Sequence, residues 1–208
     1  MPLKVDSRAV LVVIDVQYSF LPGGSLAVAN GDEVIAPINR LGKLFQNVVL
    51  TQDWHPAGHV SFASSHAHKK PLDTIRLDYG CQTLWPDHCV QGTPAAAIHA
   101  NIDIPHAQLI LRKGFNARID SYSGFIEADG VTKTGLDGYL RARGIEAVYL
   151  AGLATDFCVA FTALDARKLG FTVHVFADAC RAIDVGGSLA RAWRDMAEAG
   201  VVRLSSPT

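Results

Sequence analysis

Charged side chains are scarce in this sequence. Asp, Glu, Lys and Arg make up 19% of its 208 residues, below the usual share of about 25%. Hydrophobic residues make up 49%, which excludes an intrinsically disordered chain. A chain so poor in charge buries much of its surface, either in a sheet covered on both faces or at an interface between copies. We therefore expect a globular protein, with a homo-oligomer as one explanation of the low charge.

No sign of charge dominates, and no long apolar run is present. Nineteen basic and twenty acidic residues give a formal net charge of −1, without the positive surplus typical of proteins that bind nucleic acid or anionic membranes. The longest apolar run, residues 9–14, is far shorter than the ~20 residues of a membrane-spanning helix. Residues 1–6 contain no apolar signal-peptide core. We expect a cytoplasmic protein with no nucleic-acid or membrane partner.

Cysteines are few: the sequence has Cys81, Cys89, Cys158 and Cys180. Disulfide frameworks belong to short secreted chains, so these four are predicted to be free thiols. The chain is long enough to bury one substantial core, and no linker or repeat divides it. We expect a single domain over residues 1–208.

Buried strands alternate with helices along the chain. Apolar, β-branched runs predict parallel strands at 9–15, 48–53, 108–113, 147–151, 171–177 and 201–204. Apolar spacing and terminal glycines predict helices at 32–46, 93–101, 134–143, 156–169 and 187–199. This alternation predicts an α/β fold with helices on both faces of a parallel sheet. Residues 54–93 have no clear period and are predicted to form a long functional loop.

Chemically active side chains stand at the ends of the predicted strands. Asp15, Asp53 and Lys113 each end a strand, and Cys158 follows the strand at 147–151. The carboxyl ends of parallel strands meet at one edge of the sheet, where α/β proteins bind ligands. We therefore expect these four side chains to converge.

Cys158 is the candidate nucleophile, because a helix N-terminus lowers the pKa of a thiol and offers N–H groups to an oxyanion. The alternative is a small buried side chain without chemistry. A nucleophile needs a base, and Asp15 beside the cation Lys113 would supply one. For each of these two, the alternative is a strand-end residue that reaches solvent or a helix N-terminus.

Histidines are concentrated in one part of the chain. Five of the eight lie in a 34-residue window, namely His55, His59, His66, His68 and His88. The pair Asp53-Trp-His55, with a third ligand from the following loop, would form a metal site with open positions. Such a donor set suits zinc, iron or manganese. The alternative is that these residues only hydrogen-bond to one another.

Five motifs carry the most specific signal in the sequence. They are Asp15-Val-Gln-Tyr-Ser-Phe20, Asp53-Trp-His-Pro-x-x-His-Val-Ser-Phe62, Trp85-Pro-Asp-His-Cys-Val-Gln-Gly-Thr93, Arg112-Lys-Gly and Gly152-Leu-Ala-Thr-Asp-Phe-Cys-Val159. Together they resemble the nicotinamidase/pyrazinamidase branch of the isochorismatase-like cysteine hydrolases. The resemblance implies a three-layer α/β/α fold with a parallel six-stranded sheet in the order 3-2-1-4-5-6. It also implies hydrolysis of nicotinamide, and of pyrazinamide, to the acid and ammonia, a step of NAD salvage.

The resemblance also implies roles for individual residues. Asp15, Lys113 and Cys158 match the catalytic triad of the family. The backbone amides of Ala154 and Cys158 match its oxyanion hole. The peptide between Leu153 and Ala154 matches a cis bond.

One divalent metal ion is implied as the cofactor. Its ligands would be Asp53, His55 and His88, with His59 as a further candidate. The resemblance places the small-molecule substrate in a pocket formed by Gln17, Phe20, Trp85 and Tyr122.

Three other functions are kept as alternatives. A related amidohydrolase would act on another small amide or a carbamoyl amine, and it would need no metal ligands. A hydrolase with a metal-bound hydroxide nucleophile would need no Cys158. A non-enzymatic metal-binding module would release no ammonia from any amide.

Overall fold

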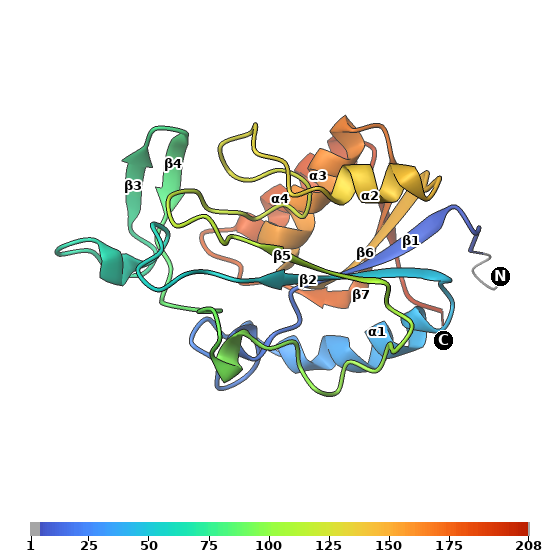
Figure 1. Ribbon diagram of the computed structural model, residues 1–208, viewed down its shortest axis with the longest axis horizontal. Coiled ribbons are helices and arrows are strands. Elements are labelled where there is room, and N and C mark those ends of the chain that lie inside the picture. The colour runs from blue at the N-terminus through green and yellow to red at the C-terminus, as the bar shows by residue number, and fades with distance from the viewer. Residues whose placement is uncertain (1–4, 208) are drawn as a thin grey trace.

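Six parallel strands form one sheet between two layers of helices (Figure 1). The structure, a computed structural model, describes residues 5–207. The strands are β1 (Ala9–Ile14), β2 (Asn47–Asp53), β5 (Leu109–Lys113), β6 (Ala147–Leu153), β7 (Thr172–Arg181) and β8 (Val202–Leu204). They lie in the order β5-β2-β1-β6-β7-β8, and all neighbours are parallel. Counted among themselves, this is the order 3-2-1-4-5-6, so the predicted fold class is confirmed.

β1 lies at the centre of the sheet, and all six of its residues are buried. Val10, Val12 and Ile14 belong to the core on one face, and Ala9, Leu11 and Val13 belong to the core on the other. Because side chains alternate between the faces of a strand, a strand covered on both sides must be apolar throughout. This explains the uninterrupted apolar run in the sequence.

Helices cover the two faces unequally. One face carries α1 (Ile35–Gly42), and the other carries α2 (Leu136–Ala142), α3 (Ala160–Lys168) and α4 (Ser188–Glu198) (Figure 1). Within residues 5–207, no helix is both long enough and apolar enough to cross a membrane.

Three of the predicted helices differ from the structure. The one predicted at 32–46 begins with a 3-10 turn, Gly31–Val34, and its α-helical part ends at Gly42. The predicted helix at 93–101 is wrong: only a 3-10 turn forms, at Pro94–Ala96. The chain then becomes extended because Ile98 pairs with Gln17. The predicted helix at 156–169 begins with a π-helical turn, Thr155–Val159, and continues as α3.

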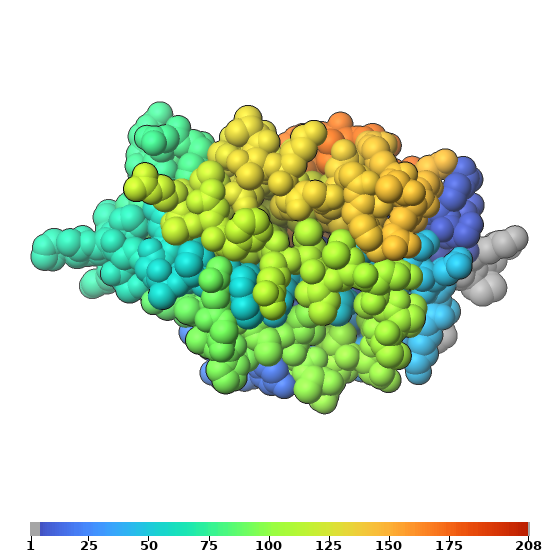
Figure 2. All heavy atoms as spheres, viewed as in Figure 1, coloured from blue at the N-terminus to red at the C-terminus, as the bar shows by residue number. Residues whose placement is uncertain are grey.

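A β-hairpin interrupts the segment predicted to be a loop. Its strands, β3 (Thr74–Leu77) and β4 (Gly80–Thr83), pair with each other and not with the main sheet. The hairpin lies beyond the carboxyl ends of the parallel strands, at the left of Figure 1. In the space-filling view, the cyan and green segment around it extends from the body of the molecule (Figure 2).

Candidate active site

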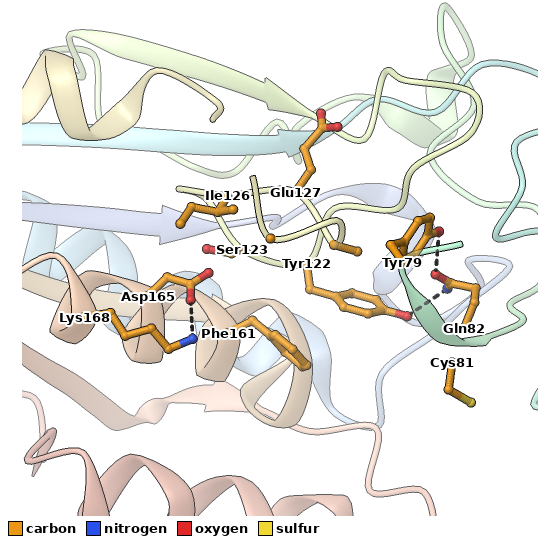
Figure 3. A pocket seen from close by; sticks show the side chains of 12 residues that line it. Tyr79, Cys81, Gln82, Tyr122, Ser123, Ile126, Glu127, Phe161, Asp165 and Lys168 are labelled. Atoms are coloured by element: carbon orange, nitrogen blue, oxygen red, sulfur yellow. Dashed lines mark hydrogen bonds and ion pairs between the residues drawn. The ribbon is translucent and has the colours of Figure 1, made fainter. Parts of the chain in front are cut away.

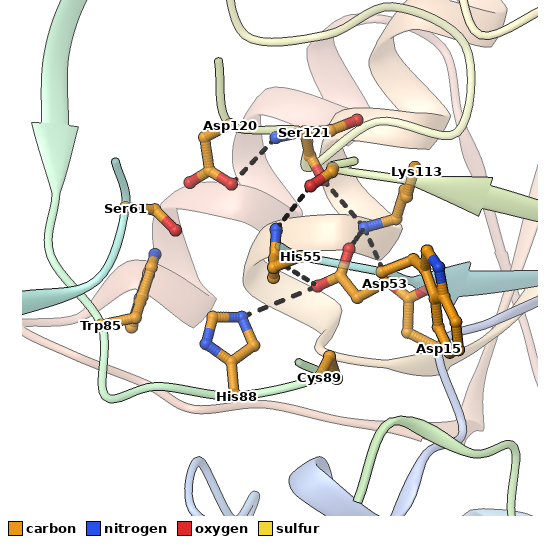
Figure 4. A network of polar contacts seen from close by, with 12 residues as sticks. Asp15, Asp53, His55, Ser61, Trp85, His88, Cys89, Lys113, Asp120 and Ser121 are labelled. Atoms are coloured by element: carbon orange, nitrogen blue, oxygen red, sulfur yellow. Dashed lines mark hydrogen bonds and ion pairs between the residues drawn. The ribbon is translucent and has the colours of Figure 1, made fainter. Parts of the chain in front are cut away.

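Register brings the charged side chains together. Asp53 at the end of β2 is paired directly with Lys113 at the end of β5. Paired residues of parallel strands project toward the same face, and the two side chains form an ion pair through Asp53 Oδ1. Lys113 Nζ also lies 2.9 Å from Asp15 Oδ2 and 3.5 Å from Cys158 Sγ. The structure therefore brings Asp15, Asp53 and Cys158 into contact with the ammonium group of Lys113, as Figure 4 shows for the charged residues.

Asp15 leaves the end of β1 in an unusual backbone conformation. Its φ of 49° lies in the left-handed region, which few non-glycine residues adopt. Thr51 of β2 holds it there: its hydroxyl accepts from Asp15 N at 3.1 Å and donates to Asp15 Oδ1 at 2.6 Å. On the other side, Gly152 of β6 approaches so closely that a Cβ would overlap the carbonyl of Ile14. The carboxylate is thus fixed between two neighbouring strands.

Charge and burial set the protonation states of this group. Burial alone would lower the pKa of Lys113, but the carboxylates of Asp15 and Asp53 hold it well above its usual value. Burial raises the pKa of Asp15, and Lys113 offsets part of that rise. Burial also raises the pKa of the Cys158 thiol well above its usual value, against the pull of Lys113. The resting thiol is therefore neutral and needs a base.

Cys158 lies in the first helical turn after β6, as predicted, but that turn is π-helical and leads into α3. The side chain is 7% exposed. The pKa of its thiol is raised and not lowered, because burial outweighs the opposing effect of Lys113. The adjoining Leu153–Ala154 peptide is cis, as the resemblance implied.

A second group surrounds the other oxygen of Asp53. Asp53 Oδ2 lies 3.5 Å from His55 Nε2 and 3.8 Å from His88 Nε2. The opposite ring nitrogens, both Nδ1, donate to the carbonyls of Gly114 and Pro86, each at 2.8 Å. A carbonyl only accepts, so these bonds fix a proton on each Nδ1, and both Nε2 atoms face Asp53. Burial lowers the pKa of His55, but the Asp53 carboxylate raises it above its usual value.

This arrangement fits a divalent metal ion. Asp53, His55 and His88 offer three ligand atoms within 4.8 Å of one another. Imidazoles that ligate metals usually donate their second nitrogen to a carbonyl or carboxylate, as both do here. Burial raises the pKa of Asp53, but Lys113 and His55 together hold it well below its usual value, so the carboxylate is ionised.

His59 is bonded differently. Its Nδ1 accepts from Ser61 N at 3.2 Å and contacts Ser61 Oγ at 2.7 Å, while its Nε2 donates to Asn116 O at 2.9 Å. Burial, followed by the neighbouring His55, lowers the pKa of His59 to about 4. Both ring nitrogens are engaged by protein atoms, so the ring buttresses His55 and presents no lone pair to Asp53.

A small cavity lies between the thiol and the histidines. It is lined by Phe20, Leu26, Asp53, Trp85, His88, Asp120, Tyr122, Ala154, Phe157, Cys158 and Ile183. Three of the four predicted substrate-binding residues are on its wall. The fourth, Gln17, lies elsewhere: its amide accepts from Asp53 N and donates to Asp53 O, both at 2.8 Å. Gln17 therefore fastens the end of β2.

Four residues of the cavity were not predicted. Phe157 directly precedes Cys158, and its ring meets Trp85 edge-on at 4.9 Å between centroids. Its place beside the candidate nucleophile was a usable signal. Leu26, Asp120 and Ile183 had none, because they come from loops whose path the sequence does not reveal.

The Isochorismatase domain family matches residues 9–207. The chain belongs to this family. A nicotinamidase of Acinetobacter baylyi is 57% identical over 204 residues, covering 98% of this chain and 95% of the relative. A nicotinamidase of Escherichia coli is 42% identical over 195 residues, covering 91% of each.

Solved structures agree with this membership. A nicotinamidase/pyrazinamidase of Acinetobacter baumanii has a TM-score of 0.97 at 59% identity, with 98% of both chains covered. A pyrazinamidase of Pyrococcus horikoshii in complex with zinc has a TM-score of 0.79 at 34% identity, with 95% of this chain and 99% of that chain covered.

Proposed function

We propose that this protein is a metal-dependent cysteine amidohydrolase that converts nicotinamide to nicotinate and ammonia in NAD salvage, and that it also accepts pyrazinamide. One observation carries the proposal: Lys113 joins a carboxylate and a thiol on one side to a metal-type ligand group on the other. The cavity for a flat ring lies between these two groups. The Acinetobacter baylyi relative, 57% identical, supports nicotinamide as the substrate.

Acylation begins with proton transfer. The Asp15 carboxylate takes the proton of the neutral Cys158 thiol, while Lys113 offsets the negative charge on both groups. The thiolate sulfur attacks the carboxamide carbon, and the backbone N–H groups of Ala154 and Cys158 receive the oxyanion. Asp15 then gives the proton to the amide nitrogen as the C–N bond breaks, which releases ammonia and leaves a thioester.

Deacylation uses the same base. A water molecule attacks the thioester carbon and gives a proton to Asp15. The C–S bond breaks, the acid leaves, and Asp15 returns the proton to the Cys158 sulfur. Because Asp15 serves both half-reactions, it must be ionised at the start of each.

Ring binding falls to the other side of the cavity. Asp53, His55 and His88 would hold a zinc, iron or manganese ion, which when bound offers a coordination position to the pyridine nitrogen. The aromatic side chains of Phe20, Trp85 and Tyr122 would enclose the ring. Orientation of the ring fixes the carboxamide over Cys158.

Ammonia release from nicotinamide tests the proposal, with benzamide as the matched compound that lacks the ring nitrogen. The metal-loaded enzyme should release ammonia rapidly from nicotinamide and pyrazinamide but slowly from benzamide. Chelation should raise KM for nicotinamide and change benzamide turnover little, and added metal should reverse the effect. Cys158→Ala should be inactive with every amide. No ammonia from either pyridine or pyrazine carboxamide would contradict the proposal.

A further inference from the structure

One buried side chain connects the β3–β4 hairpin to the wall of the cavity. Gln82 of β4 is 2% exposed, although the hairpin lies outside the main sheet. Its Nε2 donates to Asp120 Oδ2 at 2.7 Å and to the Tyr122 hydroxyl at 3.1 Å (Figure 3 shows the bond to Tyr122). The same nitrogen also lies 2.7 Å from the carbonyl of Thr83. Its Oε1 accepts from the Tyr79 hydroxyl at 3.1 Å.

The partners of Gln82 line the cavity, but Gln82 itself does not. Asp120 and Tyr122 are both on the wall. The Tyr79 hydroxyl accepts from Asp120 N at 3.3 Å. Tyr79, Gln82 and Asp120 therefore form a closed ring of hydrogen bonds between the hairpin and the loop that contains Asp120. Trp85, also on the wall, donates through Nε1 to the Tyr122 hydroxyl at 3.0 Å. A single phenol oxygen thus accepts from both Gln82 and Trp85.

These bonds set the aromatic wall. The rings of Trp85 and Tyr122 meet edge-on with centroids 6.5 Å apart, and both contact Phe157. Edge-on contacts favour one relative orientation of two rings, but they leave the rings free to move together. The hydrogen bonds to the Tyr122 hydroxyl remove that freedom, and Gln82 supplies the one that is anchored outside the cavity.

We infer that Gln82 is a positioning residue for the substrate ring: by fixing Tyr122, and through it Trp85, it holds the aromatic wall of the cavity in place. The inference rests on the proposed function, because it takes the substrate to be a pyridine carboxamide. Gln82 touches neither the substrate nor the reacting atoms. Its loss should therefore change ring binding and ring selection more than the chemical step.

The test compares Gln82→Leu with Cys81→Ala, the exposed neighbour on the same strand. Gln82→Leu keeps a similar volume and removes the polar contacts. We expect KM for nicotinamide to rise about 10-fold, as the loss of the hydrogen bond that holds the Tyr122 hydroxyl implies, and kcat to change less than about 2-fold. The ratio of kcat/KM for 5-methylnicotinamide to that for nicotinamide should rise, because the wall has loosened. Cys81→Ala should match the wild type.

Two further variants keep the inference falsifiable. Tyr79→Phe removes the donor to Gln82 Oε1 and the acceptor of Asp120 N but keeps the bond from Gln82 to Tyr122. It should therefore move KM and the 5-methyl ratio in the same direction by a smaller factor, even where Gln82→Leu does not fold. The loss in the double variant Gln82→Leu/Tyr122→Phe should be smaller than the product of the two single losses, because both changes remove the bond between Gln82 and Tyr122, although Tyr122→Phe also removes the bond from Trp85.

The outcomes separate this inference from the proposed function. An active wild type with an unchanged KM in Gln82→Leu, or in Tyr79→Phe where Gln82→Leu does not fold, would overturn the inference alone. A loss of kcat with no change in the 5-methyl ratio would also overturn it, because that pattern marks a general structural role. A wild type that releases no ammonia from nicotinamide would remove the proposed function and this inference with it.

Discussion

At the scale of single residues, the hydroxyl of Thr51 controls the candidate base. It donates to Asp15 Oδ1 at 2.6 Å and so stabilises the carboxylate, which lowers the pKa of Asp15 against the effect of burial. A hydrogen bond to a charged group contributes about 1.5–3 kcal/mol, and one pKa unit corresponds to about 1.4 kcal/mol. Thr51→Val should therefore raise the pKa of Asp15 and move the acid limb of the kcat/KM profile up by about one pH unit.

Thr51→Ser is the matched control, because it keeps the hydroxyl and loses only a methyl group. Its acid limb should coincide with that of the wild type. An acid limb that stays in place in Thr51→Val would show that Asp15 is not the group whose ionisation limits activity.

The two kinds of histidine should respond differently to substitution. His88 directs a free Nε2 at Asp53, whereas both nitrogens of His59 are already bonded to protein atoms. Loss of a residue that only supports a ligand lowers metal affinity by about 10–100-fold, and loss of a ligand should cost more. Metal titration of His88→Ala and His59→Ala should therefore show the larger loss in His88→Ala. A larger loss of metal affinity in His59→Ala would show that His59 is the ligand and that His88 only supports the site.

At the scale of elements, the turn after β5 protects a candidate metal ligand. Gly114 has a φ of +69°, and a Cβ there would overlap the His55 ring. Gly114→Ala should therefore displace His55 and lower the metal content per chain. Gly130→Ala is the control: its φ is +73°, but a Cβ there meets nothing within 4 Å. Both variants carry the same backbone cost of about 1–2 kcal/mol. Equal metal content in the two variants would show that a Cβ at residue 114 does not displace His55.

The sequence predicts the elements whose signal is local. β1 is recognisable as a buried strand because each of its residues packs on one of two cores. Asp15, Asp53 and Lys113 are recognisable as strand-end residues because each directly follows or ends such an apolar run. The hairpin is different. β3 alternates exposed Thr74 and Arg76 with half-buried Ile75 and Leu77, but four residues are too short a run to stand out as a strand in the sequence.

Gln82 shows why part of the site escapes prediction. An amide side chain has no chemistry that singles it out in a sequence. Its role depends on partners 38 and 40 residues away, Asp120 and Tyr122. The π-helical turn before α3 was missed for a similar reason: the sequence pattern resembles that of an ordinary helix start, and the cis peptide and the strand register that shape the turn are tertiary features.

At the scale of the whole molecule, Lys113 compensates two buried carboxylates at once. Lys113→Met would leave Asp15 and Asp53 without their cation, at a cost of about 3–5 kcal/mol in stability near neutral pH. The folded-state pKa of the carboxylates would then rise above the unfolded value. Stability is retained at low pH, where they are protonated, and is lost as pH rises through the folded-state pKa.

Urea unfolding of the metal-free protein at pH 5.5 and pH 8 measures this effect. The deficit of Lys113→Met relative to the wild type should be larger at pH 8. Lys168→Met serves as the control, because Lys168 pairs with Asp165 at the surface, and its deficit should be below about 1 kcal/mol at both values. A deficit in Lys113→Met that does not vary with pH would show that lost packing, and not charge, is the cause.

Asp53 divides its two oxygens between different tasks, one toward Lys113 and one toward the histidines. The two halves of the cavity consequently share a single unit of negative charge. Any cation bound at the histidines competes with Lys113 for that charge. The ammonium group of Lys113 would then interact more strongly with Asp15 and Cys158. Ring binding and the reactivity of the thiol are therefore coupled through Asp53. A substitution that changes one of them, whether selected or designed, should also change the other.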